Sequence, residues 1–303
     1  MSEAAIVIVT HQSGAEIGGC LDAARHLGAE IVVVDNASSD ATCREVTRRN
    51  VRLIANCDNL GFASAVNQGI KAVTAPYVLL LNPDARLTTD LTALIECCRE
   101  PGVAGACGKL VDEDGHPQVG FAVRSLPSPA ALIYEALLLN RLWKTNSVNW
   151  HYRCLGFDYS APADVEQPAG AFLMIRRDVW QDLGGFDERF HPLWFEDVDF
   201  CRRARDRGYR MRYTPQAVAK HTGGHSLANI SLEKHQLYWY RGVLRFSVKH
   251  YRSGTARMVC VAVFLGSIPR MLLGLAVFRS LAPIAIYFRV MALAARIFLQ
   301  PAG

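Results

Sequence analysis

The stretch YVLLLNPDA, residues 77–85, carries the pattern on which the fold depends. Its first five residues are largely apolar and indicate a buried strand. The Asn-Pro-Asp that follows ends this strand, because proline has no backbone N–H to donate within a sheet. Asp84 is therefore expected just beyond the carboxyl end of a buried strand. Taken alone, the segment fits a simple turn as well as it fits a carboxylate that binds a metal ion.

Three more short apolar runs come before this strand, and stretches of helical length separate all four. The runs are residues 6–10, 31–34 and 51–55, and the helical stretches are about residues 15–27, 40–49 and 63–73. Such alternation is typical of an α/β protein with a mainly parallel sheet covered on both faces. Ligands of these sheets bind beyond the carboxyl ends of the strands, where the sequence places Thr10, Asp35 and Asp84.

The composition is that of a folded protein, since half of the 303 residues are apolar and a fifth are charged. The length allows one large domain or two modest ones. The nine cysteines form no CxxC pair, so we expect buried thiols in a reducing compartment and neither zinc nor redox chemistry. The apolar residues 4–9 are too few for a signal peptide and indicate a strand, which predicts a protein that is cytoplasmic or faces the cytoplasm.

Charge is distributed unevenly along the chain. The whole chain has 33 Lys and Arg against 28 Asp and Glu, a net charge of +5. Residues 241–303 hold nine of the basic residues and no acidic ones, which leaves 24 basic and 28 acidic residues, a net charge of −4, in residues 1–240. Apolar runs separate the basic residues near the C-terminus. This spacing argues against a nucleic-acid partner and favours an anionic membrane surface.

Residues 227–303 are expected to form a helical region that associates with the membrane. A first helix, over residues 231–252, places basic residues on one face with aromatic residues between them. A solvated helix face fits this pattern, and so does an interfacial helix that binds anionic lipid or a diphosphate head group. The longest uncharged run beyond it, residues 258–269, is shorter than the ~18–20 residues that a spanning helix needs. Helical hairpins in the interface are therefore favoured, with tilted spans and snorkelling arginines as the alternative.

The regular pattern is lost between residues 111 and 166, where Pro, Gly and Ser recur. A segment of this length predicts a functional loop or lid, with a helix over residues 129–142. Regular structure returns with a strand over residues 169–175 and a helix over residues 196–207.

Two clusters in the first hundred residues have the composition of a nucleotide-binding site. In VVDNASSD, residues 33–40, the Asp at the strand end can accept from a nucleobase N–H or a ribose hydroxyl, and it can equally cap a helix. In NLGFASAVNQG, residues 59–69, Gly61 lets the backbone approach a ligand, and the helix N-terminus favours an anionic group. The chain has no GxGxxG motif, which argues against a dinucleotide-dependent dehydrogenase.

A third group of motifs follows in the order GAFLMIRR (170–177), GGFDERF (184–190) and WFEDVDFC (194–201). The last motif has three carboxylates in four residues directly after two aromatic residues, which is costly in an apolar setting. A carboxylate kept dry can act as a general base, whereas the acidic start of a surface helix is the simpler alternative. His221 and His225 follow a short strand-like run. Such histidines are more often structural, but one at a strand end can complete a metal site.

Together and in this order, these motifs closely resemble the inverting glycosyltransferases of family 2 with the GT-A fold. Among these, they are most similar to the bacterial rhamnosyltransferases of O-antigen and cell-wall linker assembly. The resemblance covers roughly residues 4–226, and its specificity lies in the combination rather than in any one motif. It implies a Rossmann-like GT-A catalytic domain over residues 1–226, with a donor-binding half at 1–110 and an acceptor half at 111–226.

The resemblance also implies which residues bind the nucleotide of the donor. Thr10 and Asp35 would hold the base and the ribose. Asn59, Gly61 and Asn67 would shape the same pocket.

By the same resemblance, Asp84 stands where the family has a metal-binding aspartate, and His221 where it has a C-terminal metal-binding histidine. The ion would be Mg²⁺ or Mn²⁺. Asp197 would be the catalytic base, with Glu196 orienting it or the acceptor. Asn82 departs from the family pattern, which has an aspartate at that position, and this weakens the inference of tight metal binding.

The implied reaction transfers a sugar with inversion, and dTDP-L-rhamnose is the favoured donor. The implied acceptor is a saccharide linked to polyprenyl diphosphate at the cytoplasmic face of the cell membrane. Another nucleotide sugar and a non-catalytic membrane scaffold of polysaccharide assembly remain as alternatives. A nucleotidyltransferase is a third, but it should carry a Gly-rich phosphate loop with a basic residue where this chain has THQSGA, residues 10–15.

Overall fold

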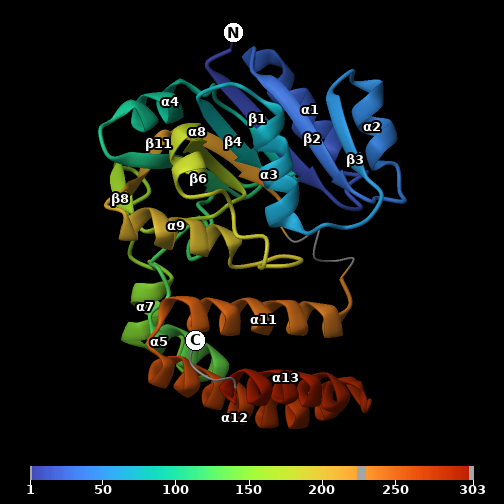
Figure 1. Cartoon of the computed structure of the whole chain (residues 1–303), viewed down its shortest axis with the longest axis vertical. Coiled ribbons are helices and arrows are strands. Elements are labelled where there is room, and N and C mark those ends of the chain that lie inside the picture. The colour runs from blue at the N-terminus through green and yellow to red at the C-terminus, as the bar shows by residue number, and fades with distance from the viewer. Residues whose placement is uncertain (1, 224–229, 300–303) are drawn as a thin grey trace. The chain divides into compact units, whose positions relative to one another are not determined.

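The computed structural model describes residues 2–223 and 230–299, and the chain divides into two compact units (Figure 1). The first unit consists of Met1–Leu126, Arg153–Pro192 and Glu196–Asn229. The second consists of Pro127–Tyr152, Leu193–Phe195 and Ile230–Gly303.

The first unit alternates strands and helices through its N-terminal half. Its elements are β1 (Ala4–Thr10), α1 (Ile17–Ala24), the 3₁₀ helix η1 (Arg25–Leu27), β2 (Glu30–Asn36), α2 (Thr42–Arg48), β3 (Arg52–Asn56), α3 (Phe62–Ala72), β4 (Tyr77–Leu81), β5 (Ala85–Leu87), α4 (Thr92–Arg99), β6 (Val103–Val111), β7 (Val123–Arg124), β8 (Ala163–Val165), β9 (Gln167–Pro168), β10 (Phe172–Arg176), α8 (Arg177–Asp182), α9 (Glu196–Asp206) and β11 (Arg210–His221). The four strands expected before residue 82 are therefore confirmed.

One sheet of nine described strands forms the centre of this unit. Its order is β3-β2-β1-β4-β10-β6-β11-β5, and β8 pairs with β11. The pairs β1–β2, β1–β4, β2–β3 and β6–β11 are parallel, whereas those that involve β10, β5 and β8 with their neighbours are antiparallel. The α/β fold class is confirmed, and the sheet has its parallel part in the N-terminal half.

Burial explains why these segments form strands rather than surface elements. The central strands β1 and β4 are almost wholly buried, and Ile6, Ile8 and Leu79 have no exposed surface. A strand covered on both faces has apolar residues without alternation, as seen in residues 77–81. Helix α3 packs on β1 and β2 (Figure 1), and this close approach depends on Gly69, since a Cβ there would lie 2.4 Å from Val7 Cγ1.

The second unit consists of helices. Its elements are α5 (Pro129–Ala136), α6 (Leu139–Leu142), α7 (Ser147–Tyr152), α11 (Leu232–His250), α12 (Ser253–Phe278) and α13 (Ala282–Phe298). Figure 1 shows α11 running alongside the α12–α13 hairpin. Tyr240 and Phe246 of α11 are buried, so these aromatic side chains form the core of the unit instead of facing a lipid surface.

Two expectations need correction, one about the length of the apolar helix and one about the segment 111–166. Pro269, the last residue of the uncharged run 258–269, lies inside the continuous helix α12 and does not end it. As a result, Ser253–Val277 is long and apolar enough to cross a membrane, contrary to the expectation from the uncharged run alone. The segment 111–166 is also less irregular than expected, since α5, α6 and α7 lie within it.

Candidate active site

The register between two strands brings the predicted metal ligands together. His221 is the last residue of β11, and it pairs with Ala85 of β5. Asp84 directly precedes Ala85, so its side chain lies beside the imidazole ring. The distance from His221 Nε2 to Asp84 Oδ1 is 3.3 Å, and both side chains are buried. His225 lies outside the described residues.

The loop after β6 surrounds the His221 ring. Gln118 lies 2.9 Å from Nδ1 through its Oε1, and its Nε2 donates to the backbone carbonyl of His221 at 2.6 Å. Phe121 stacks on the ring with centroids 5.3 Å apart and an interplanar angle of 8°. Asn82 Nδ2 lies 3.5 Å from Nε2. The ring thus has polar neighbours at both nitrogens and an aromatic cover on one face.

Asp197 lies in the first turn of α9, and the loop before β10 holds its carboxylate. Oδ2 accepts from Gly170 N–H at 3.1 Å and from Gln167 Nε2 at 3.3 Å, while Oδ1 accepts from its neighbour Val198 N–H at 2.8 Å. The next residue along that loop, Ala171, accepts from Asn82 N–H at 3.0 Å. One short loop therefore contacts the Asp197 carboxylate and the turn that carries Asp84.

The carboxyl groups of Asp197 and Glu196 are both harder to ionise than usual. Burial raises the pKa of Asp197 above 3.8, although the Gly170 and Val198 N–H groups lower it in part. Burial and the neighbouring Asp197 carboxylate raise the pKa of Glu196 well above 4.5. Glu196 Oε2 has no hydrogen-bond partner among the described residues. Carboxyl groups whose pKa is raised by burial are typical of acid–base sites.

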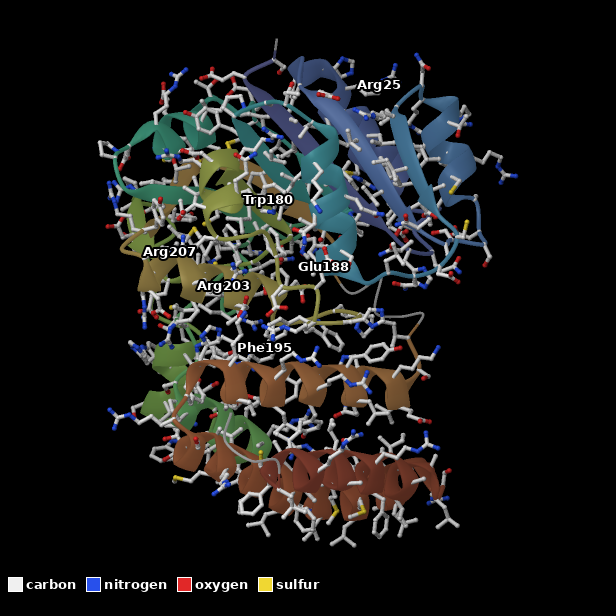
Figure 2. The ribbon with its side chains drawn as sticks, in the orientation of Figure 1. Arg25, Trp180, Glu188, Phe195, Arg203 and Arg207 are labelled. Carbon is white, nitrogen blue, oxygen red and sulfur yellow. The ribbon has the colours of Figure 1, made fainter. Side chains whose placement is uncertain are left out.

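Another acidic residue of the same motif is structural. Asp199 is fully buried and forms an ion pair with Arg203 at 2.7 Å. Arg203, labelled in Figure 2, also donates to the carbonyls of Leu183 and Gly185. The pair thus ties α9 to the turn that follows α8.

Thr10 and Asp35 are held together at the carboxyl ends of β1 and β2. They are partners in the register of these parallel strands, and Thr10 Oγ1 donates to Asp35 Oδ1 at 2.8 Å. Ser38 adds two bonds to the same carboxylate, from its N–H at 2.8 Å and from its hydroxyl at 2.6 Å. The structure brings these two predicted donor-binding residues into direct contact, with the carboxylate already oriented.

Gly61 occupies the sharp turn before α3, with a φ of +84° that favours glycine. A Cβ at this position would lie 3.0 Å from the Pro192 carbonyl oxygen, so the turn also needs a residue without a side chain. Asn59 Oδ1 accepts from Gly61 N–H at 3.0 Å. Because Phe62 N–H donates to Pro192 O at 2.7 Å, one amide of this helix start is already occupied by the protein.

Asn67 has a different environment from the other predicted donor-binding residues. Its Oδ1 accepts from Trp180 Nε1 and Phe186 N–H, and its Nδ2 donates to Phe186 O and Glu188 Oε1. Trp180 and Glu188 are labelled in Figure 2. These four bonds satisfy the buried amide completely and give Asn67 a structural task, so its role at the donor stays a prediction.

Gln118, Phe121 and Gln167 each contact a predicted site residue, although none of the three was predicted. No signal in a single sequence marks them, because Gln118 lies 103 residues from His221 and Gln167 lies 30 residues from Asp197. Gln118 and Phe121 lie in the segment 111–166 that was expected to be irregular, and Gln167 directly follows it. These glutamines and Phe121 meet the predicted site residues only once the strands of the sheet have paired.

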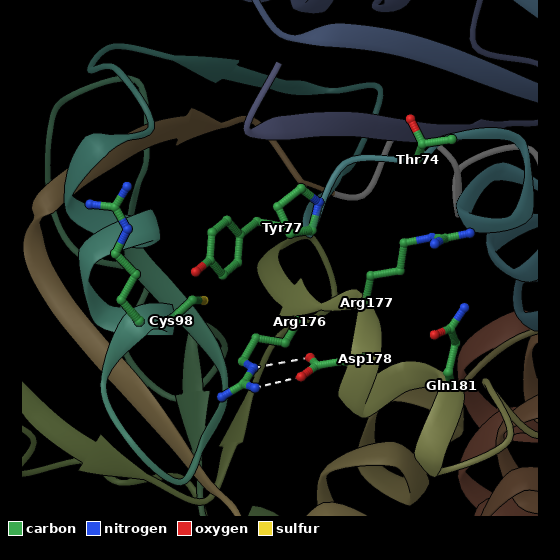
Figure 3. A pocket seen from close by; sticks show the side chains of 9 residues that line it. Thr74, Tyr77, Cys98, Arg176, Arg177, Asp178 and Gln181 are labelled. Atoms are coloured by element: carbon green, nitrogen blue, oxygen red, sulfur yellow. Dashed lines mark hydrogen bonds and ion pairs between the residues drawn. The ribbon is translucent and has the colours of Figure 1, made fainter. Parts of the chain in front are cut away.

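A cavity of about 480 Å³ lies where β4 begins and β10 ends, at the strand ends away from Asp84 (Figure 3). Its lining includes Arg99, Arg176, Arg177 and Asp178, and Arg176 forms an ion pair with Asp178 at 2.5 Å. None of the predicted site residues lines it. The loop after β6 also carries a cluster of Asp112, Asp114 and His116, of which Asp114 and His116 are exposed, and Gln118 follows this cluster in the same loop.

Comparison with known proteins identifies the family. The sequence model of glycosyl transferase family 2 matches residues 5–160, and that of glycosyl transferase family group 2 matches residues 138–299. The chain is 28% identical over 278 residues to an N-acetylglucosaminyl-diphospho-decaprenol L-rhamnosyltransferase of Mycobacterium tuberculosis, covering 80% of this chain and 88% of that protein. It is 23% identical over 253 residues to an O-antigen chain rhamnosyltransferase of Salmonella typhimurium, covering 78% of this chain and 71% of the relative.

A solved structure shows the same fold at lower identity. The chain resembles a mannosyltransferase from Pyrobaculum calidifontis in complex with GDP-Man and Mn²⁺, with a TM-score of 0.54 and 15% identity. The similarity covers 97% of this chain and 84% of the other. The family match spans more than half of the chain and agrees with the motifs, the fold and the relatives. The chain therefore belongs to glycosyl transferase family 2.

Proposed function

We propose that this protein is an inverting glycosyltransferase that moves L-rhamnose from dTDP-L-rhamnose to a saccharide linked to polyprenyl diphosphate. The observation that carries the proposal is that one loop contacts both the Asp197 carboxylate and the turn that carries Asp84, which lies beside His221. The chain is also related to a rhamnosyltransferase whose name gives a lipid-linked substrate. The choice of rhamnose rests on that relative. Another nucleotide sugar is the alternative, since the similar mannosyltransferase structure contains GDP-Man.

In the proposed reaction, the Asp197 carboxylate takes the proton from an acceptor hydroxyl. The hydroxyl oxygen forms a bond to the anomeric carbon, while the bond from that carbon to the diphosphate oxygen breaks on the opposite face. The single displacement inverts the anomeric configuration and releases the nucleoside diphosphate. The bonds from Gly170 and Gln167 hold the carboxylate in place before the acceptor arrives.

Asp84 and His221 fit a divalent cation by their chemistry. A carboxylate oxygen and an imidazole nitrogen face each other at 3.3 Å in a buried setting, and both are ligand atoms that Mn²⁺ accepts. A bound Mg²⁺ or Mn²⁺ supplies positive charge for the leaving diphosphate. Thr10 and Asp35 lie at the carboxyl ends of neighbouring strands, where we place the base and ribose of the donor, with Asn59 and Gly61 at the same edge.

The test of the base is Asp197→Asn in a radiolabelled sugar-transfer assay with a polyprenyl-linked acceptor. We expect transfer to fall by about 10²–10⁴-fold, while binding of the nucleotide sugar changes little. Asp206→Asn, on the same helix, is the matched control and should keep wild-type transfer. Wild-type turnover in Asp197→Asn would reject this residue as the base. Transfer from another nucleotide sugar but not from dTDP-L-rhamnose would correct the donor alone.

We further propose that the second unit attaches the enzyme to the cytoplasmic face of the membrane, with α12 and α13 lying in the plane of the surface. On α12, five of the exposed large apolar residues recur at spacings of three and four, so these five share one helix face. They are Met258, Val261, Leu265, Ile268 and Leu272. On α13 and just before it, Phe288 and Leu281 are exposed in the same way.

Two arginines favour this orientation over a membrane span. Arg270, in the middle of the apolar part of α12, donates to the carbonyls of Glu135 and Ala136 of α5. Arg289, near the middle of α13, forms an ion pair with Glu233 of α11. Since α13 packs along α12, a span would carry Arg289 and Arg296 into hydrocarbon at about 2.5–3.5 kcal/mol each.

Flotation with anionic vesicles tests the membrane face. We expect Leu265→Glu combined with Leu272→Glu to weaken binding by at least about tenfold, because two inserted apolar side chains are lost. Val248→Glu, an exposed position on α11, should bind as the wild type.

A protease site inserted between Arg279 and Ser280 should be cleaved from the cytoplasmic side of the membrane. Cleavage from the other side alone would show that α12 spans.

A further inference from the structure

The carboxamide of Gln118 contacts His221 at two points. Its Nε2 donates to the His221 backbone carbonyl at 2.6 Å, and its Oε1 lies 2.9 Å from ring atom Nδ1. A carbonyl oxygen can accept but cannot donate, so the amide nitrogen must face it. The amide oxygen is therefore turned toward the ring.

This orientation determines which ring nitrogen carries the proton. Oε1 can only accept, so Nδ1 must be the donor. In the neutral ring, Nε2 then keeps its lone pair, and this lone pair is directed to the side where Asp84 Oδ1 lies at 3.3 Å. The amide of Asn82, 3.5 Å from Nε2, is consistent with an acceptor at that nitrogen.

Gln118 itself is held by the backbone around it. Its N–H donates to Leu110 O at 3.0 Å, and its carbonyl accepts from Phe121 and Ala122 at 3.1 and 3.0 Å. The same tight turn places the Phe121 ring nearly parallel to the imidazole, with centroids 5.3 Å apart. The imidazole is thus restrained in rotation and in tilt.

We propose that Gln118 is a positioning residue that presets His221, with Nδ1 protonated and Nε2 available as a ligand. This inference rests on the metal site in the proposed function. Groups that hold a ligating histidine through its other nitrogen typically change metal affinity 10- to 100-fold when they are removed. Gln118 forms a second hydrogen bond, from its Nε2 to the backbone carbonyl of the same histidine.

The test compares Gln118→Leu with Gln118→Glu in the full-length protein. Leucine cannot accept from Nδ1, so we expect Mn²⁺ affinity, measured from the EPR signal of the free ion, to fall about 10- to 100-fold. Glutamate accepts as well as glutamine and should keep wild-type affinity or increase it. Gln181→Leu and Gln181→Glu change an exposed glutamine in α8, away from His221, and are the matched controls. Both should leave Mn²⁺ affinity unchanged.

A purely structural role predicts the opposite order, because glutamate loses the bond to the backbone carbonyl and adds a charge in a half-buried place. Equal loss in both variants, or greater loss in Gln118→Glu, would overturn the proposal.

A second measurement does not depend on metal. In metal-free protein labelled with ¹⁵N-histidine, and with His221→Gln to assign the signal, the wild type and Gln118→Glu should show the proton on Nδ1. Gln118→Leu should shift the proton toward Nε2. A wild-type ring with its proton on Nε2 and none on Nδ1 rejects the role of Gln118. If the wild type has its proton on Nδ1 but does not bind Mn²⁺, the proposed metal site is rejected, whereas the role of Gln118 in positioning His221 is supported.

Discussion

Glu196 and Asp197 are neighbours in sequence, but their carboxyl groups have different surroundings. Three N–H donors hold the Asp197 carboxylate, whereas Glu196 Oε2 is buried without a hydrogen-bond partner among the described residues. Both have a raised pKa, and burial is the main cause in each. Asp197 is therefore the better placed of the two to carry a negative charge, which a base requires.

The pH dependence of transfer follows from the raised pKa of Asp197. A base must be ionised, so kcat/KM should rise with pH through that pKa, at a higher pH than for an exposed aspartate. The positive charge of Arg124 lowers the pKa of Asp197 in part. We expect Arg124→Gln to move the acidic limb of the kcat/KM profile further upward. Arg202→Gln, which removes a charge paired with Asp206 on α9, should leave the limb in place. An unmoved limb in Arg124→Gln would contradict the assignment.

Glu196 should make stability depend on pH in the opposite sense to an ordinary ion-paired acid. Because its pKa is raised above 4.5, the folded protein binds more protons than the unfolded chain from pH 4.5 upward. Its contribution to stability is therefore lost as pH rises through the raised pKa. We expect Glu196→Gln to increase Tm relative to the wild type at pH 8, with the difference shrinking toward pH 4.5. A difference that does not vary with pH would mean that Glu196 does not titrate in this range.

At the scale of elements, Asn67 joins α3 to the segment after α8. Its removal in Asn67→Ala leaves the buried Trp180 Nε1 and both backbone groups of Phe186 without their partner. At about 1 kcal/mol or more for each unsatisfied group, we expect the free energy of unfolding to fall by about 3 kcal/mol. Urea unfolding measures this. Gln68→Ala, which removes bonds to part-buried Asn56, should cost about 1 kcal/mol or less. Unchanged stability with weaker nucleotide binding would support the donor role predicted from sequence instead.

Close packing between α12 and α5 depends on Gly266. A Cβ at this position would lie 1.9 Å from the carbonyl oxygen of Ala136, the same oxygen to which Arg270 donates. We expect Gly266→Ala to destabilise the protein by about 1–3 kcal/mol in thermal unfolding, in spite of the higher helix propensity of alanine. Gly254→Ala is the matched control, since a Cβ there meets no atom within 4 Å, and it should be neutral or stabilising by up to about 1 kcal/mol. Equal effects of both changes would show that the two helices do not pack so closely.

Elements with a simple residue pattern could be predicted from the sequence. The runs at 77–81 and 31–34 are continuous and apolar, and both are strands. Strand β6 was missed because glycines interrupt its apolar residues, and one of them, Gly105, is required where a Cβ would lie 2.5 Å from Met174 O. Most of β11 was missed because Arg210, Arg212 and Pro215 interrupt the apolar pattern in its first half. β6 and β11 are stabilised by pairing with strands that lie far away in the sequence, so their own residues give little sign of them.

The candidate site was predictable to a similar degree. Asp84 and His221 were named from motifs, and the structure places them in contact. The glutamines that hold His221 and Asp197 have no motif of their own, because their role depends on which loops the sheet brings together. The same reason applies to residues 127–152, which form one unit with the C-terminal helices although they are expected by sequence in the acceptor half.

At the scale of the whole molecule, residues 1–240 have a net charge of −4, whereas the C-terminal region has only basic charges. Among the exposed arginines of that region, Arg257, Arg279 and Arg296 lie on or next to α12 and α13. Replacing all three with glutamine should weaken binding to anionic vesicles by about 100-fold, at about 1 kcal/mol for each arginine. Binding to neutral vesicles should change little, and flotation measures both. Equal loss on both lipids would show that the arginines support the fold of the unit rather than its attachment.

The apolar face of α12 bears on how the enzyme would reach the lipid-linked acceptor that we propose. If this face holds the protein on the bilayer, then enzyme and lipid-linked acceptor share a two-dimensional phase, and the donor alone arrives from solution. The reaction rate then depends on the mole fraction of acceptor in the bilayer, not on its amount per volume. Diluting the acceptor with inert lipid at constant total acceptor should slow transfer, whereas adding buffer should change it little while donor is saturating.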